Sequence, residues 1–291
     1  MYAISIISTS GIPFSTIMIQ KEPQDIDLAM HFFTFSLPLG EMCPGSFELE
    51  AGLMSALYEF SRCVDQPIET LKFRHVGKIN KEVSEDKIIY KNKHITIEYP
   101  VNSDILITTR NEKFINRTAL EAKIIVIYSE LLRKYTPIGP ERELSPQDQQ
   151  NIIDILINKD QIDLLKKRES NLKEKIKTIL ETYKQYGLES IVICGFDLQP
   201  IFLGIEDADL ILSMMRDIET FPFVEPFEWR YRTSFVKGTE YWIYIVNSGL
   251  AVDSHNIKMN YYYMLITKEG SFLGETPYKI LTEINEILFF E

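Results

Sequence analysis

The fold is decided by one stretch in the second half of the chain, Ile191-Val-Ile-Cys-Gly-Phe-Asp-Leu-Gln-Pro-Ile-Phe-Leu-Gly-Ile205, because it repeats the way the chain opens. A shift of 187 positions places Ile4 on Ile191 and Pro13 on Pro200. Each copy reads as an apolar strand, a polar corner that contains Pro, and a second strand. Such self-similarity indicates that one structural unit occurs twice in the chain.

The residues that follow the first opening predict a defined succession of elements. An apolar period of three and four residues over 46–64 predicts a helix, and Glu48 and Glu50 lie in its first turn, where carboxylates are favourable. Three strands come next, and then a helix in which Thr118 and Glu121 have capping-box spacing. The expected ranges are 2–8, 14–19, 46–64, 68–73, 93–99, 104–109 and 118–135.

The second half predicts matching elements. Lys237-Gly238 predicts a hairpin turn between two of its strands, and Thr276-Pro277 predicts the start of its last helix. The expected ranges are 191–194, 201–205, 207–219, 227–237, 240–246 and 259–267, followed by a helix from 276 onward. Both halves have the order β-β-α-β-β-β-α. This order predicts an α+β protein with two units, each a five-stranded antiparallel sheet with flanking helices.

A helical connector is expected between the two units. Pro and Gly residues end the preceding helix, and Ser145-Pro146 starts a new one with an N-cap hydroxyl and Pro at the first helical position. Apolar residues at helical spacing form a stripe from Ile162 to Tyr183, and this spacing is interrupted near Glu169. The stripe is expected to cover a flanking domain. The expected division is a first domain over 1–136, the connector over 137–187 and a second domain over 188–291.

Composition narrows the classes of partner. The 291 residues are 45% hydrophobic and carry a formal net charge of −11, which argues against a nucleic-acid partner. The negative charge is concentrated in 187–291, which contains sixteen acidic and seven basic residues. No window suits a membrane-spanning helix, although a local basic patch in the first 140 residues would permit peripheral membrane association. The three cysteines cannot all form disulfides, and no two of them have the C-x-x-C spacing of a metal site. This cysteine usage favours a cytoplasmic protein.

The residue types that carry catalysis show no convergent spacing. The chain has no glycine-rich phosphate-binding loop, and its four histidines lie far apart in sequence. The acidic run Glu206-Asp207-Ala-Asp209 is expected to cap a helix rather than to hold a cation. We therefore expect a protein that is not an enzyme and needs no cofactor.

Two aromatic segments are the candidate partner-interface sites. The first, 31–39, separates the second strand of its unit from the helix expected over 46–64, and the second, 221–227, occupies the equivalent place in the second unit; both are expected to form loops. The candidate residues are Phe32, Phe33, Phe35, Leu37, Phe221 and Phe223. Aromatic side chains in a loop make good interface anchors. The alternative, which we favour, is that each segment packs into its own core or into the junction between the units.

Several segments resemble the longin and roadblock superfamily. In the first unit these are Ile4–Ser8, the corner Ser10–Phe14, and the helix segment Phe47–Ser61. The run Gly-Leu-x-Ser-Ala-Leu-x-x-Phe-Ser within that segment is similar to the first helix of archaeal-type longin-like proteins. In the second unit the corner Asp197–Pro200 matches, but the helix near 207–219 lacks the Gly-x-x-Ser-Ala pattern.

The resemblance implies a non-catalytic role. Longin and roadblock units are dimerising platforms, and they bind and modulate small Ras-like GTPases in trafficking and signalling complexes. The expected partners are therefore a small Ras-like GTPase and either a longin or roadblock protein or a second copy of this chain. The alternative is a tandem small-molecule sensor of PAS or GAF type, which would need a ligand cavity inside the sheet. A hydrolase with dispersed carboxylates has no supporting spacing.

Overall fold

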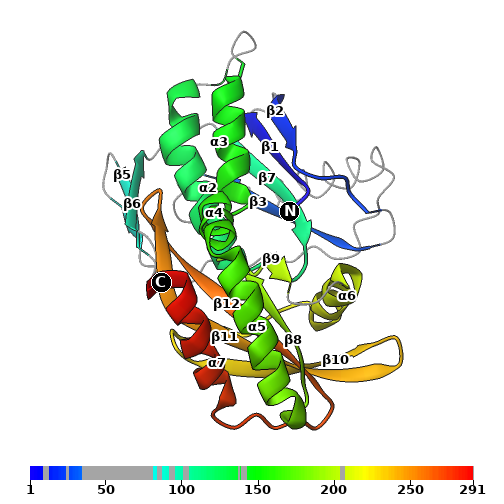
Figure 1. The fold of residues 1–291 in the computed structure, drawn as a ribbon. Helices are drawn as coiled ribbons and strands as arrows, with labels where there is room; N and C mark the ends of the chain where they lie inside the picture. Colours follow the sequence, from blue (N-terminus) through cyan, green and yellow to red (C-terminus); the bar gives the residue numbers. More distant parts are fainter. Residues whose placement is uncertain are drawn as a thin grey trace.

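The computed structural model describes most of the second half of the chain and parts of the first. The described residues are 1–8, 13–23, 26–34, 81–83, 87–91, 96–100, 105–136, 138, 143–203 and 207–290. This part is α+β, with the antiparallel sheets and helices that the sequence predicts as a class (Figure 1). The helix expected over 46–64 and the strand expected over 68–73 lie outside the described residues.

Within the described residues, the first sheet contains four strands. In spatial order they are β2 (Pro13–Met18), β1 (Ala3–Ser8), β7 (Ile105–Glu112) and β3 (Leu28–Thr34). The inward side chains of its central strands, such as Ile4 on β1 and Ile107 on β7, are fully buried. Because strand side chains alternate between the two faces, these residues give the sheet one apolar face.

This arrangement corrects two expectations. The loop expected over 31–39 is wrong for His31–Thr34, which belong to β3 and pair with β7. The strand expected over 93–99 is observed as β6 (Thr96–Pro100), but it lies in a separate three-stranded sheet. The other strands of that sheet are β4 (Lys81–Val83) and β5 (Lys87–Lys91). Among the described residues, the first unit therefore does not form one five-stranded sheet.

The second sheet has the element order that the sequence predicts. Its five antiparallel strands lie in the order β10-β11-β12-β8-β9, with β10 and β9 at the edges. The strands are β8 (Leu188–Cys194), β9 (Pro200–Leu203), β10 (Trp229–Val236), β11 (Thr239–Ser254) and β12 (Ile257–Lys268). The helices are α6 (Ala208–Ile218) and α7 (Thr276–Asn285), so the order is β-β-α-β-β-β-α.

Helix starts follow local capping rules. Ser145 caps α3 (Pro146–Leu156) as predicted, and its hydroxyl accepts a hydrogen bond from the Asp148 N–H at 3.1 Å. Asp207 caps α6 by accepting from the Leu210 N–H at 2.9 Å, which confirms the capping interpretation. The helix expected over 118–135 begins instead after Asn116, whose side-chain Oδ1 accepts from the N–H groups of Thr118 and Ala119. It consists of α2 (Arg117–Val126), a π-helical turn (Ile127–Leu132) and a 3₁₀ turn (Arg133–Tyr135).

The described residues of the connector are mostly helical, as expected, and form three α-helices. After α3 come α4 (Lys159–Lys167) and α5 (Glu169–Tyr183). The helical path is first interrupted at Asn158, whose φ of 61° is left-handed. The second interruption is at Arg168, next to Glu169, where the apolar spacing is also interrupted. As expected, the apolar stripe is covered: Leu165, Leu172 and Ile176 pack in the core of the second sheet.

Two apolar clusters cover the two faces of the second sheet. On one face lie α5 and α7, which cross in front of the strands in Figure 1. On the other face, α6, Leu120 of α2 in the first half and Ile152 of α3 in the connector join Val192 and Ile243 of the second sheet. The first and second sheets thus share one continuous core.

Candidate functional site

The candidate site is built on β10, an edge strand of the second sheet. The strand forms because Lys237 and Gly238 adopt left-handed φ values of 52° and 79°, which a tight hairpin turn needs. The hairpin places Tyr231 opposite Tyr244 and Thr233 opposite Trp242 on β11. Helices α5 and α7 pack on the central strands β8, β11 and β12. Most side chains of β10 are instead exposed in the described structure.

Aromatic rings line one face of the β10–β11 hairpin. Tyr231 stacks on Trp242 with ring centroids 5.2 Å apart and planes 15° apart, and it also contacts Tyr244 at 5.7 Å. Trp229 lies against Tyr244 at 5.3 Å. Burial raises the pKa of Tyr244, whose hydroxyl donates to the Ser271 carbonyl at 2.8 Å. The inner rings are thus fixed by the core, whereas Tyr231 keeps 44% of its surface exposed.

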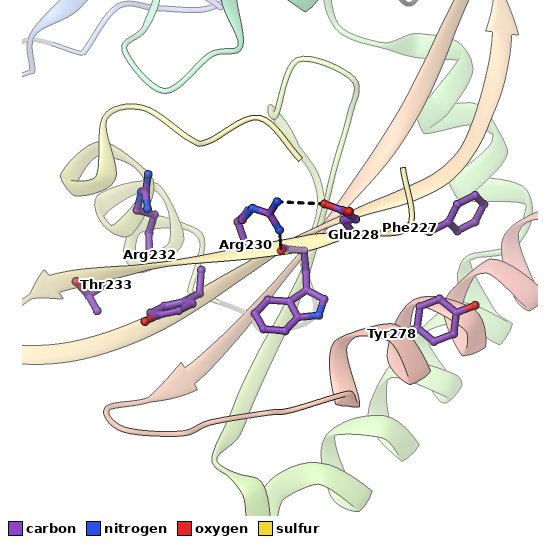
Figure 2. A pocket seen from close by; sticks show the side chains of 8 residues that line it. Phe227, Glu228, Arg230, Arg232, Thr233 and Tyr278 are labelled. Carbon is purple, nitrogen blue, oxygen red and sulfur yellow. Dashed lines mark hydrogen bonds and ion pairs between the residues drawn. The ribbon is translucent and has the colours of Figure 1, made fainter. Parts of the chain in front are cut away.

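The opposite face of the same strand carries arginines. Arg230 and Arg232 are both exposed, and Figure 2 shows them on one side of β10 with Thr233 on the other. Arg230 pairs with Glu228 at 3.2 Å, while Arg232 has no ion-pair partner within the part of the chain that the structure describes. The strand therefore presents aromatic surface on one side and positive charge on the other.

An open groove runs along this edge. It holds about 750 Å³ and is lined by consecutive residues of 227–233 together with Tyr278 of α7. Phe227 and Tyr278 lie at one end of the groove in Figure 2 and are 46% and 54% exposed. The groove is long and open rather than enclosed, so its shape suits a polypeptide segment better than a buried small molecule.

Comparisons with family models, with curated proteins and with solved structures found no match. The function must therefore be argued from the site itself.

Four of the six predicted interface residues lie in the described part of the chain, and they differ in burial. Phe32 is 41% exposed on β3 of the first sheet, and its neighbour Phe33 is buried in the core. Phe35 and Leu37 lie outside the described residues. In the second half, Phe221 is half-buried against the core, and Phe223 is 53% exposed. For Phe33 and Phe221 the packing alternative is confirmed; partner contact by the others stays a prediction.

The sequence analysis missed β10 as a site. The segment Trp229-Arg-Tyr-Arg-Thr-Ser-Phe-Val236 alternates bulky apolar residues with polar ones, which predicts a strand with two different faces. What the pattern does not give is the position of that strand at the edge of the sheet. Alternating aromatic and basic residues in an otherwise acidic segment are the signal that could have drawn attention to it.

The corner Asp197–Pro200, which carries the resemblance in the second half, is internal. The Asp197 carboxylate is fully buried and accepts from Lys123 Nζ at 2.8 Å, from Asn158 Nδ2 at 2.9 Å and from the Gln199 N–H at 3.2 Å. Burial acts to raise the pKa of Asp197, but Lys123 and Asn158 hold it below its usual value. Burial also lowers the pKa of Lys123, against the attraction of the carboxylate.

This network joins the two halves of the chain. Lys123 belongs to α2, Asn158 precedes α4, and Asp197 lies between β8 and β9. A second contact between the halves is the bidentate pair of Arg216 on α6 with Glu112 on β7, with a shortest separation of 2.7 Å. The buried Asp197 carboxylate of the corner thus fixes the architecture and is not accessible to a partner.

Among the described residues, no helix has the length and apolarity to cross a membrane.

Proposed function

We propose that this chain is a non-catalytic protein-interaction platform that binds and regulates a small Ras-like GTPase. The observation that carries the proposal is the exposed edge strand β10, which presents aromatic side chains on one face and arginines on the other. Its outward main-chain groups at Tyr231 and Thr233 have no main-chain partner in the described part of the chain. Tyr, Trp and Arg are the residue types that dominate binding energy at protein interfaces. An exposed aromatic surface of this kind marks a site for a macromolecular partner.

The nature of the partner rests on the resemblance. The second half has the element order β-β-α-β-β-β-α and the single five-stranded sheet that the longin and roadblock resemblance implies. Proteins of that superfamily bind and modulate Ras-like GTPases. The order of elements supports this partner as an analogy of fold, which is why the proposal needs a direct test.

The test is capture of a GTPase from a lysate of the source cell with the full chain as bait. Parallel samples contain GDP, a non-hydrolysable GTP analogue or a magnesium chelator. The proposal expects a Ras-like GTPase in one nucleotide condition and little in the others. Recovery of no GTPase under any condition would contradict it and would direct attention to a bound metabolite, as the sensor alternative requires.

Matched variants connect the capture to the site. Tyr231→Ser removes an exposed ring from β10, and Met18→Ser removes a side chain of similar exposure, 54%, from β2 of the first sheet. Capture is expected to fall at least about tenfold with Tyr231→Ser, as for an interface hot spot, and to persist with Met18→Ser. Equal capture by both variants would show that the GTPase binds elsewhere.

A further inference from the structure

Only one edge of the β10 main chain forms hydrogen bonds to a neighbouring strand in the described structure. Within the described residues only β11 pairs with this strand. In an antiparallel ladder, alternate residues direct their N–H and C=O groups away from the neighbouring strand. The Phe235 N–H donates to Asp217 Oδ2 of α6 at 2.8 Å, so Phe235 is one of these residues. The outward set is therefore Trp229, Tyr231, Thr233 and Phe235.

Both ends of this outward row are locally occupied. Asp217 takes the Phe235 N–H, and Arg230 Nη1 donates to the Trp229 carbonyl at 2.9 Å. Between them lie the N–H and C=O groups of Tyr231 and Thr233, which make no main-chain pairing on that side in the described structure. A free row of alternating donors and acceptors is a template on which another strand can pair.

The side chains around this row define what kind of strand fits. A strand added beside β10 would place alternate side chains on the two faces of the sheet. On one face they would meet the rings of Trp229 and Tyr231, and on the other the guanidinium groups of Arg230 and Arg232. Complementary side chains are apolar on the first face and carboxylates on the second.

The charge of the surroundings favours an acidic partner over a second copy. Arg230, Arg232 and Lys237 are three of only seven basic residues in 187–291, so positive charge is gathered at this edge of an acidic segment. If two copies paired antiparallel about Tyr231 or Arg232, arginine would face arginine. Like charges directly opposite each other destabilise strand pairing, whereas opposite charges stabilise it.

We propose that β10 accepts an extended segment of a partner protein as an additional strand, and that this segment alternates apolar residues with Asp or Glu. Its main chain pairs with Tyr231 and Thr233. Its apolar side chains pack on the aromatic face and its carboxylates pair with Arg230 and Arg232. The inference goes beyond the proposed function because it specifies the docking chemistry and holds whether or not the partner is a GTPase.

The experiment measures amide hydrogen exchange of the full chain with two synthetic peptides of equal length. One alternates Val with Glu, and the control alternates Val with Lys. The acidic peptide is expected to slow exchange of the Tyr231 and Thr233 amides, and to bind at least about tenfold more tightly than the basic one, because both charge pairs reverse sign. Its binding should weaken as salt is added.

Two substitutions separate strand pairing from other modes of binding. Thr233→Pro removes an outward N–H without removing a bond to β11, so the sheet is retained and peptide binding is lost, whereas Thr233→Val keeps both. The double change R230E/R232E reverses the charge of one face and should transfer the preference to the basic peptide. This switch is a gain of binding, so loss of folding cannot produce it.

Several outcomes would overturn the inference. These are exchange at Tyr231 and Thr233 that is unchanged at saturating acidic peptide, equal affinity for the two peptides, and unaltered binding by Thr233→Pro. Protection of the same amides that grows with protein concentration, without peptide, would show that a second copy of the chain pairs with this edge. A second copy would then be the occupant in place of the acidic segment. None of these results depends on capture of a GTPase, so the two proposals can fail separately.

Discussion

Removing the buried carboxylate at position 197 should cost much of the stability of the protein. Asp197→Ala leaves the Lys123 ammonium in a site where both side chains are fully buried, and it leaves Asn158 Nδ2 and the Gln199 N–H without an acceptor. Breaking a buried ion pair by removing one partner typically costs about 3–5 kcal/mol. For a chain of this size such a loss lowers the melting temperature by on the order of 10 °C.

A double-mutant cycle tests whether the charge is the cause. Lys123→Met alone leaves a buried carboxylate that keeps only the donors Asn158 Nδ2 and the Gln199 N–H, and combining it with Asp197→Ala removes both charges at once. The double variant then retains only the cost of unpaired donors and a small cavity, about 2–3 kcal/mol. We therefore expect it to be more stable than Asp197→Ala by itself, with losses far from additive.

The assay is equilibrium urea unfolding followed by circular dichroism, with the transition midpoint compared at constant slope. Lys159→Met is the control, because Lys159 pairs with Asp154 at a similar distance, 2.9 Å, but on the surface, and its midpoint should not move. A loss below about 1 kcal/mol for Asp197→Ala, or single losses that simply add in the double variant, would refute the reasoning.

Three further predictions concern single residues. Gly249→Ala should destabilise by about 1–3 kcal/mol, because φ is +71° and an added Cβ would lie 2.4 Å from the Phe227 ring; urea unfolding measures this, and an unchanged midpoint would contradict the close packing. Burial raises the pKa of the Cys194 thiol, so alkylation followed by peptide mass spectrometry should modify Cys194 only after denaturation. Burial opposes ionisation of Asp148, but hydrogen bonds from Ser145 and Tyr135 lower its pKa to about 2 from 3.8. A lowered carboxyl pKa stabilises the fold above the unfolded value and loses this effect as pH falls. The stability difference between the wild-type chain and Asp148→Asn should thus shrink between pH 4 and 2, and a pH-independent difference would exclude the cause.

Elements with local signals could be predicted from the sequence. The repeat of strand, corner and strand in the second half, the hairpin at Lys237-Gly238 and the helix after Thr276-Pro277 all lie where the sequence places them. Each depends on neighbouring residues: a turn that needs left-handed φ, or a Pro in the first turn of a helix. Ser145 as a cap is predictable for the same reason.

Elements that depend on distant pairing could not be predicted. The run around Phe32 and Phe33 lacks clean alternation, and it becomes a strand because β7, far along the chain, pairs with it. In the same way, nothing local assigns Thr96–Pro100 to a separate sheet. Capping by Asn116 instead of Thr118 is a shift of two residues, within the usual uncertainty of helix starts.

At the candidate site too, the local features could be predicted from the sequence and the features that depend on distant pairing could not. The alternation of Trp229, Tyr231 and Thr233 with arginines predicts a strand with two unlike faces. Its exposure is a property of the strand order, which makes β10 an edge, and of α5 and α7, which pack mainly on β8, β11 and β12. Conversely, Asp197 lies in a polar corner that reads as a surface turn, and its burial is set by Lys123 from the other half of the chain.

The most direct test of the central claim is a binding measurement between the full chain and a purified Ras-like GTPase recovered by nucleotide-dependent capture. The GTPase is loaded with GDP or with a GTP analogue, and each form is titrated against the wild-type chain, Thr233→Pro and Thr233→Val. The account predicts preference for one nucleotide form, at least about tenfold weaker binding by Thr233→Pro, and retained binding by Thr233→Val. Equal affinity for both nucleotide forms, with no effect of Thr233→Pro, would contradict it.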